Sequence, residues 1–347
     1  MSKKQELYFP AEWHKQSFVQ LTWPHAESDW YYMLEEVETC FIEIAKAISQ
    51  RQKLLVVTPE KKNVEKILKE AGATMENIIV FSCRSNDTWA RDHGFITLLG
   101  KEDGTPHYVD FGFNGWGKKF EASLDNAINK QLYASGIIKG EYIDENAWIL
   151  EGGSVESDGK GTLLTTSQCL FAPNRNSMMR EKLEAALCEK LHCNNILWLD
   201  YGNLIGDDTD GHIDTIARLA PNDTIIYMAP NKDDDEQYYD LSMMEEQLQE
   251  FRTASGLPYR LLALPSPQPI YDEDELRLPA TYANFLIMNS AVLYPTYAQP
   301  DNDAKAAEVL KAAFPDKEIV GIDCRALIKQ HGSLHCVTMQ YPSPDNI

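Results

Sequence analysis

Side chains that can do acid–base and nucleophilic chemistry recur at regular places in this sequence. Asp92 stands in "TWARDHG", Glu151 in "ILEGGS" and His212 in "DGHID", at intervals of 59 and 61 residues. Asp214 follows His212 by two residues, and Cys336 stands in the late segment "GSLHCVTMQ". Each residue alone has a simpler explanation, such as a turn acid, a fragment of a metal site or a buried thiol. Their regular spacing predicts instead that these groups converge on one place.

A thiol, an imidazole and several carboxylates together suit one kind of electrophile. A thiolate is a strong nucleophile, and histidine is the natural proton shuttle near neutral pH. Carboxylates beside the nucleophile would repel the negative charge that develops when an ordinary amide is attacked. They would instead bind a planar guanidinium cation through its paired N–H donors and hold its central carbon for attack. The set therefore favours hydrolysis of a guanidino group.

A repeated order of elements explains how this spacing could bring the groups together. Residues 148–199 read as strand, tight turn, strand, helix and strand, with the helical pattern over 176–191. The same order recurs over 210–265 and 283–323, and two degenerate copies precede them. Because each unit must bury its apolar face on its neighbours, about five such units predict an α/β fold of modules around a common axis. The first strands would carry the reactive side chains to that axis, and Cys336 would begin a final strand.

A single domain is expected over residues 1–347, because no low-complexity or Pro/Gly/Ser-rich linker interrupts the chain. The chain has 53 acidic against 32 basic residues, a formal net charge of −21. Such a surface repels nucleic acid and anionic membranes, and it favours cations such as a polyamine or a guanidinium.

The cysteines and the N-terminal segment indicate the compartment. Seven cysteines at irregular spacings, without a C-x-x-C pair, argue against a disulfide framework or a zinc knuckle. No apolar run follows the two lysines near the N-terminus, and no stretch approaches the roughly 20 apolar residues of a membrane span. We therefore expect a cytoplasmic protein.

The acidic segment Asp207–Asp214, "DDTDGHID", allows a different class of function, because its side chains could ligate a metal. A calcium loop with Gly211 at its sixth place would begin at Gly206 and end at Ala217, and neither residue supplies a side-chain oxygen. A His-x-Asp fragment of an iron or zinc site remains an alternative. A non-catalytic acidic scaffold that binds polyamines is a further one.

Five motifs resemble, in the same order, those of the agmatine deiminases: "FPAEWHKQSFVQLTWPH", "NDTWARDHG", "EGGSVESDGKGTLLTT", "DGHIDTIARL" and "GSLHCVTMQ". That family belongs to the guanidine-modifying superfamily, whose fold is a five-bladed, pseudo-symmetric α/β-propeller (pentein) of strand–strand–helix–strand units. The resemblance covers residues 7 to 342. It implies hydrolysis of agmatine to N-carbamoylputrescine and ammonia in polyamine biosynthesis, without a metal or an organic cofactor, by a homodimer.

The resemblance also implies a role for each reactive residue. Cys336 would attack the guanidinium carbon and form an amidino-cysteine intermediate. Asp92 and Asp214 would bind the guanidinium nitrogens. His212 would protonate the departing ammonia and then activate water, and Glu151 would orient His212 or share in binding the substrate.

The far end of agmatine is an ammonium on an aliphatic chain, so an acidic and aromatic rim is expected around the entrance. The candidates for this rim are Asp87, Trp89, Trp116 and Asp208. A deiminase of free arginine, a methylated arginine or peptidylarginine is the alternative. An α-carboxylate would require a positioned cationic side chain, and Arg91 and Arg218 are the nearest in sequence.

Overall fold

The computed structural model describes residues 6–233 and 235–344, which form a mixed α/β fold with six β-sheets. Two sheets have four strands: β2 (Gln16–Thr22), β3 (Lys53–Thr58) and β4 (Ile78–Ser82) with β19 (Thr338–Pro342), and β1 (Leu7–Tyr8), β5 (Ile96–Gly100), β6 (Pro106–Gly112) and β7 (Glu141–Ile149). Three sheets have three strands: β8 (Val155–Ser157), β9 (Thr162–Thr166) and β10 (Asn195–Leu199); β11 (Ala217–Ala220), β12 (Thr224–Met228) and β13 (Arg260–Leu264); and β16 (Leu286–Ile287), β17 (Ala291–Thr296) and β18 (Glu318–Asp323). The sixth sheet is the hairpin of β14 (Ile270–Tyr271) and β15 (Arg277–Leu278).

Helices of two lengths connect these strands. The longer ones are α1 (Leu34–Ser49), α2 (Lys61–Glu70), α6 (Ile128–Ala134), α8 (Arg180–Leu191), α9 (Asp235–Glu250) and α10 (Pro300–Ala313). The short ones are η1 (Tyr31–Met33), η2 (Met75–Asn77), α3 (Ala90–His93), α4 (Gly115–Lys118), α5 (Ser123–Asn126), η3 (Gly152–Ser154), α7 (Ser167–Leu170), η4 (Ile213–Thr215) and α11 (Arg325–Ile328). Within the described ranges, no helix is both long enough and apolar enough to cross a membrane.

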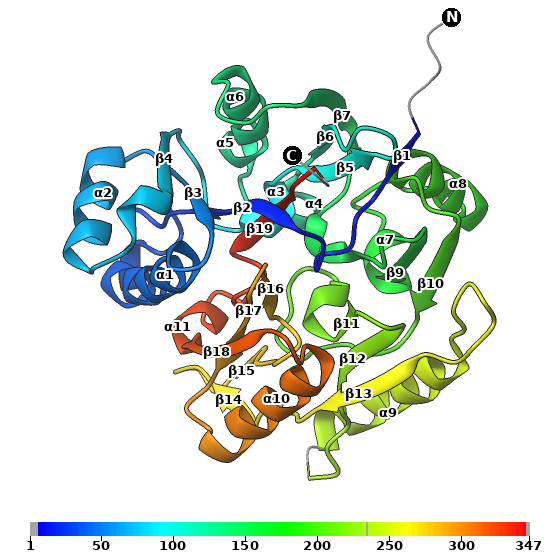
Figure 1. Ribbon diagram of the computed structural model, residues 1–347. Helices are drawn as coiled ribbons and strands as arrows, with labels where there is room; N and C mark the ends of the chain where they lie inside the picture. Colours follow the sequence, from blue (N-terminus) through cyan, green and yellow to red (C-terminus); the bar gives the residue numbers. More distant parts are fainter. Residues whose placement is uncertain (1–5, 234, 345–347) are drawn as a thin grey trace, which may run out of the picture.

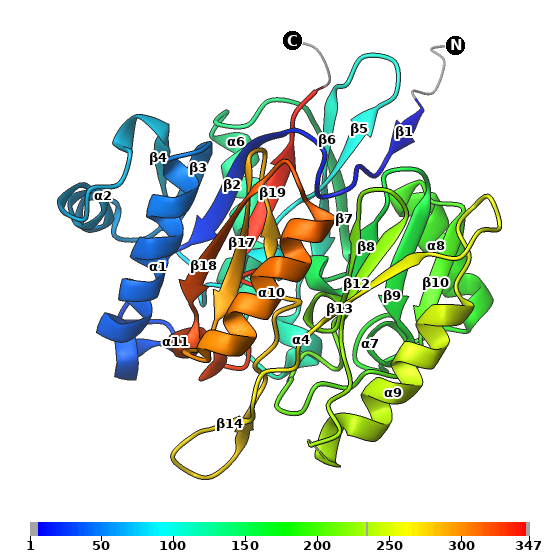
Figure 2. The same cartoon turned by 60° about the horizontal axis from the view of Figure 1, so that its bottom comes forward.

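The sheets follow one another around the centre of the molecule in the order of the chain (Figure 1). The longer helices lie toward the outside, and the short α3 and α4 lie near the centre (Figure 1). Strand β19 pairs antiparallel with β2, so the last strand and one of the first share a sheet (Figure 2). The chain therefore returns to its starting point.

The three units that the sequence predicts over 148–199, 210–265 and 283–323 have the expected order of elements. In each, the first two strands pair antiparallel and the third returns parallel to the second after a helix: β8, β9 and β10 around α8, β11, β12 and β13 around α9, and β16, β17 and β18 around α10. Helix α8 shows why the units pack. Its Leu183, Leu187 and Leu191 recur at helical spacing and are buried, so they form the face that packs onto the rest of the unit.

Short turns, and not the strands themselves, carry the reactive residues. Asp92 lies in α3, Asp214 lies in η4, and Glu151 and His212 directly precede η3 and η4. The expectation that Cys336 begins a strand is wrong, because β19 starts two residues later. The amide of Thr338 donates to the carbonyl of residue 335 at 3.0 Å, which closes a turn around the cysteine.

Candidate active site

The turns before β5, β8, β11 and β19 bring all the predicted reactive side chains together inside the molecule. The exposed fractions of Asp92, Glu151, His212, Asp214 and Cys336 are 4, 0, 0, 1 and 4%. Gly153 stands between three of them. A Cβ there would lie 2.6 Å from His212 Nδ1, 2.9 Å from Asp92 Oδ1 and 3.1 Å from Asp214 Oδ2, so only glycine fits. This close approach explains why the second residue after Glu151 is glycine.

The Cys336 thiol faces two oxygen-bearing side chains. Its Sγ lies 3.9 Å from Asp214 Oδ2 and 3.4 Å from Asn284 Oδ1. Its amide also donates to Asn284 Oδ1 at 3.2 Å, and its carbonyl accepts from the amide of Arg91 at 3.1 Å. Burial, together with the carboxylates of Asp214 and Asp92, holds the pKa of the Cys336 thiol well above its ordinary value.

Asp92 is held by two hydrogen bonds of known direction. Trp116 Nε1 donates to its Oδ2 at 2.9 Å, and the amide of Gly153 donates to its Oδ1 at 3.0 Å. His212 Nδ1 lies 3.6 Å from the same Oδ1. Burial raises the pKa of Asp92 to about 6, although the neighbouring His212 acts to lower it. The carboxylate therefore ionises only near neutral pH.

Asp214 differs from Asp92 because a histidine side chain lies within hydrogen-bonding distance of its carboxylate. His335 Nδ1 lies 2.7 Å from Asp214 Oδ2, and His335 Nε2 lies 2.7 Å from Glu12 Oε2. Burial acts to raise the pKa of Asp214, but the hydrogen bond and charge of His335 outweigh it and lower that pKa below its ordinary value. Asp214 Oδ1 has no hydrogen-bond partner, so one oxygen remains open to a ligand.

His212 is fully buried, and neither of its ring nitrogens has a hydrogen-bond partner. Burial alone would lower the pKa of His212, but the Asp92 carboxylate, the Cys169 thiol and Glu151 raise it well above its ordinary value. Glu151 is anchored through Oε1, which accepts from Arg175 Nε at 3.0 Å, and its Oε2 has no partner. The imidazole therefore keeps its proton, because negatively charged or polarisable groups surround it.

A pocket of about 290 Å³ leads from the surface to Cys336 and Asp92. All of the predicted rim residues line it: Asp87, Trp89, Trp116 and Asp208. Glu151, His212 and Asp214 do not line this pocket and lie beyond its inner end. The pocket thus has the reactive thiol and one carboxylate at its base and aromatic and acidic groups along its sides.

The rim carboxylates are partly desolvated. Burial, with the negative charge of Asp29, raises the pKa of Asp87 to about 7, and Trp89 Nε1 donates to its Oδ2 at 3.0 Å. Burial likewise raises the pKa of Asp208 to about 6. The ring centroids of Trp89 and Trp116 lie 6.4 Å apart, with their planes at 78°. Such a wall suits an alkyl chain that ends in a cation.

Comparison with known proteins places the chain in a family. The Porphyromonas-type peptidyl-arginine deiminase family matches residues 8–342, which is nearly the whole chain. The chain belongs to this family. A relative from Pseudomonas fluorescens named agmatine deiminase is 32% identical, with 98% of this chain and 97% of that protein covered. A relative from Stutzerimonas stutzeri with the same name is 30% identical over 97% of this chain and 96% of that protein.

Solved structures agree with the family assignment. A putative arginine deiminase from Porphyromonas gingivalis is 51% identical, with a TM-score of 0.91 over 97% of this chain and 99% of that one. A C. jejuni agmatine deiminase with substrate bound is 37% identical, with a TM-score of 0.90 over 99% of this chain and 98% of that one. A dimethylarginine dimethylaminohydrolase is only 10% identical, with a TM-score of 0.51, and shares the fold alone.

Three residues of this family member escaped sequence reasoning. Asn284 accepts hydrogen bonds from the amides of both Cys336 and His335. It lies just before β16, in a position like that of the reactive residues of the other units, and this register could have revealed it. Alternation along the strand expected at Cys336 would turn the adjacent His335 to the opposite face, but His335 contacts Asp214 instead. Arg175, the partner of Glu151, gives no local signal.

The acids that suggested a metal site have other partners in this family member. Asp207 Oδ2 accepts from the amide of Gly211 at 2.8 Å, and Asp207 Oδ1 accepts from Thr209 Oγ1 at 2.7 Å. Asp210 pairs with Arg175 and, at 2.7 Å, with Lys119 Nζ. Within residues 6–233 and 235–344, neither of the groups that could hold a metal ion contains an acid from 207–210. Those carboxylates build the turn that presents His212.

Proposed function

We propose that this chain is an agmatine deiminase, which hydrolyses agmatine to N-carbamoylputrescine and ammonia. The observation that carries the proposal is the convergence of the Cys336 thiol with two carboxylates: Cys336 and Asp92 line one pocket, and Asp214 Oδ2 lies 3.9 Å from the Cys336 sulfur. The relatives named agmatine deiminase, which match nearly the whole chain, support the same reaction.

The reaction divides into two transfers at one carbon. Asp92 and Asp214 accept hydrogen bonds from the N–H groups of the guanidinium. The Cys336 thiol loses its proton to solvent, and its sulfur attacks the central carbon. The carbon–nitrogen bond breaks as His212 gives a proton to the departing ammonia, which leaves an amidino-cysteine. Water loses a proton to His212 and attacks the same carbon. The carbon–sulfur bond then breaks, which releases the urea product and restores the thiol.

The electrostatics of the pocket favour attack only when the substrate is bound. The two carboxylates and burial disfavour the Cys336 thiolate in the empty pocket. A guanidinium between the carboxylates adds a positive charge beside the sulfur, and an opposite charge lowers the pKa of a thiol. His212 keeps its proton through its neighbour Asp92, as a general acid requires. Glu151 lies beside His212 and orients it.

Agmatine fits the pocket better than arginine does. The rim of Asp87, Asp208 and aromatic rings complements an ammonium end, whereas arginine has an α-carboxylate there. Arg91 and Arg218 contact the buried carboxylate of Glu12 instead of lining the pocket. The lysine in the pocket wall, Lys329, pairs with Glu36 at 2.8 Å.

We infer further that the multi-stranded sheets are the blades of a five-bladed, pseudo-symmetric propeller of the pentein kind, and that residues 1–347 form one domain. The support is the strand order, an antiparallel pair followed by a parallel pair, that recurs in five of the six described sheets, and the succession of the sheets around the centre (Figure 1). In this arrangement the turn before each first strand points to the centre, where the reactive residues lie.

An ammonia-release assay across agmatine, free arginine and an arginyl peptide tests the activity. We expect turnover of agmatine that survives a strong chelator and disappears in Cys336→Ala. Mass spectrometry of the unaltered enzyme, quenched in acid during turnover of agmatine, should find the amidino group retained on Cys336. A folded protein that turns over no guanidine would overturn the proposal, and a preference for the arginyl peptide would favour the alternative substrate.

A further inference from the structure

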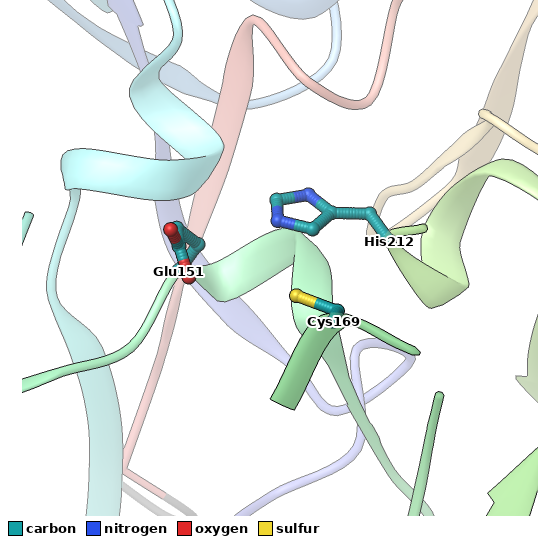
Figure 3. Close-up of side chains that lie close together, drawn as sticks. All are labelled: Glu151, Cys169 and His212. Atoms are coloured by element: carbon teal, nitrogen blue, oxygen red, sulfur yellow. The ribbon is translucent and has the colours of Figure 1, made fainter. Parts of the chain in front are cut away.

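A second thiol lies deep beside the catalytic histidine. Cys169, in α7, is fully buried, as are Glu151 and His212. A carboxylate oxygen of Glu151, Cys169 Sγ and a ring nitrogen of His212 all lie within 4.8 Å of one another. Figure 3 shows the three side chains turned toward the same small space. The proposed reaction uses Cys336 and gives this thiol no part.

The atoms that face this space lack partners. Glu151 Oε2 and both ring nitrogens of His212 are buried without a hydrogen bond, although buried polar atoms are normally satisfied. In a tetrahedral zinc site with bonds of about 2.0–2.3 Å, the ligand atoms lie roughly 3.3–3.7 Å apart. Separations of up to 4.8 Å reach that range after small side-chain rotations.

The other group of possible ligands provides a contrast. Glu12, Glu156 and His335 are also buried and close together. Their oxygens, however, are already occupied by the guanidinium of Arg218, which pairs with both glutamates. A cation has no place there. In the group of Glu151, Cys169 and His212, Arg175 bonds only Oε1 of Glu151, so Oε2 remains open.

We propose that Glu151, Cys169 and His212 bind a zinc ion, with water as the fourth ligand, and that this ion inhibits the enzyme. One oxygen, one sulfur and one nitrogen form a donor set that zinc accepts, and a carboxylate with a thiolate balances its charge. The inhibition rests on the proposed function, because zinc on His212 removes the proton carrier. The binding itself does not depend on it.

The test measures zinc binding in a protein that lacks the nucleophile. Cys336→Ser is titrated with zinc chloride against a chromogenic chelator, alone and combined with Cys169→Ser. Combination with Cys193→Ser is the matched control, because Cys193 is another buried thiol and contacts Cys188 instead. We expect one tight site in Cys336→Ser that weakens at least tenfold with Cys169→Ser and changes less than twofold with Cys193→Ser.

Cobalt(II) gives a readout that is independent of affinity and of folding in the double variants. A thiolate-to-metal charge-transfer band should appear in Cys336→Ser. Glu151→Gln is a second ligand variant in case Cys169→Ser does not fold. The proposal is overturned if Cys336→Ser binds no zinc, or if removal of Cys169 or Glu151 leaves the affinity unchanged. If zinc binds as expected but agmatine is not hydrolysed, the metal site stands and the proposed function fails.

Discussion

His335 offers the sharpest test of how the site is held. Its Nδ1 lies 2.7 Å from Asp214 Oδ2 and its Nε2 lies 2.7 Å from Glu12 Oε2. The amide nitrogen of glutamine can replace Nε2, whereas that of asparagine can replace Nδ1. His335→Gln therefore loses the hydrogen bond to Asp214 and keeps the one to Glu12, and His335→Asn does the reverse.

The size of the effect follows from the lost bond. A hydrogen bond to a charged group contributes about 1.5–3 kcal/mol. Since about 1.4 kcal/mol corresponds to a factor of ten, His335→Gln should lower kcat/KM for agmatine by roughly 10–100-fold. His335→Asn should retain more activity than His335→Gln. The ammonia-release assay, with kcat and KM separated, measures both.

The pH profile separates this positioning role from simple damage to the fold. His335 lowers the pKa of Asp214, so its removal raises that pKa. Because only ionised Asp214 binds a guanidinium, the acid limb of kcat/KM should move to higher pH in His335→Gln. His107→Gln is the control, because it replaces a buried histidine on β6 that does not line the pocket. Its kcat/KM should stay within twofold of that of the unaltered enzyme. An unshifted limb and a kcat/KM within twofold of the unaltered enzyme would refute the reasoning.

Three more predictions concern the neighbouring groups. Trp116→Phe removes the 2.9 Å hydrogen bond to Asp92 and should lower kcat/KM about tenfold or more in the same assay; an unchanged value would mean that the indole only fills space. Asp92 has a pKa raised to about 6, so kcat/KM of the unaltered enzyme should fall as pH drops below 6, and a flat profile down to pH 5 would contradict its role in binding. Arg175→Met leaves Glu151 buried without its ion pair and should lower the free energy of unfolding by about 3–5 kcal/mol in urea titrations; a loss below about 1 kcal/mol would show that Glu151 does not need it.

The repeated units were readable because their apolar residues recur at the periods of strands and helices. The boundaries of the helices and strands were harder to predict. A helix was predicted from residue 176, but α8 begins at Arg180. Asn176 instead bonds the backbone of Ile149, with its Oδ1 accepting from the amide at 3.0 Å. This contact joins distant parts of the chain, so no local pattern reports it.

The site was predictable to the extent that its residues share a register. Asp92, Glu151 and His212 could be aligned because each opens a unit. The residues that hold the reactive groups in place could not be predicted, since the contact of His335 with Asp214 depends on the turn geometry before β19. The sequence predicts a strand there, and alternation along a strand turns His335 away from the site.

The pairing of β19 with β2 has a consequence for how the enzyme is made. Tyr341 donates a hydrogen bond of 2.7 Å to Gln20, across a sequence separation of 321 residues. During translation, therefore, β2 emerges from the ribosome long before its neighbour does, and one of its edges stays unpaired. Cys336, the proposed nucleophile, also emerges after Asp92, Glu151, His212 and Asp214. A prematurely terminated product would then lack hydrolytic activity, and its unpaired strand edge would be prone to aggregation.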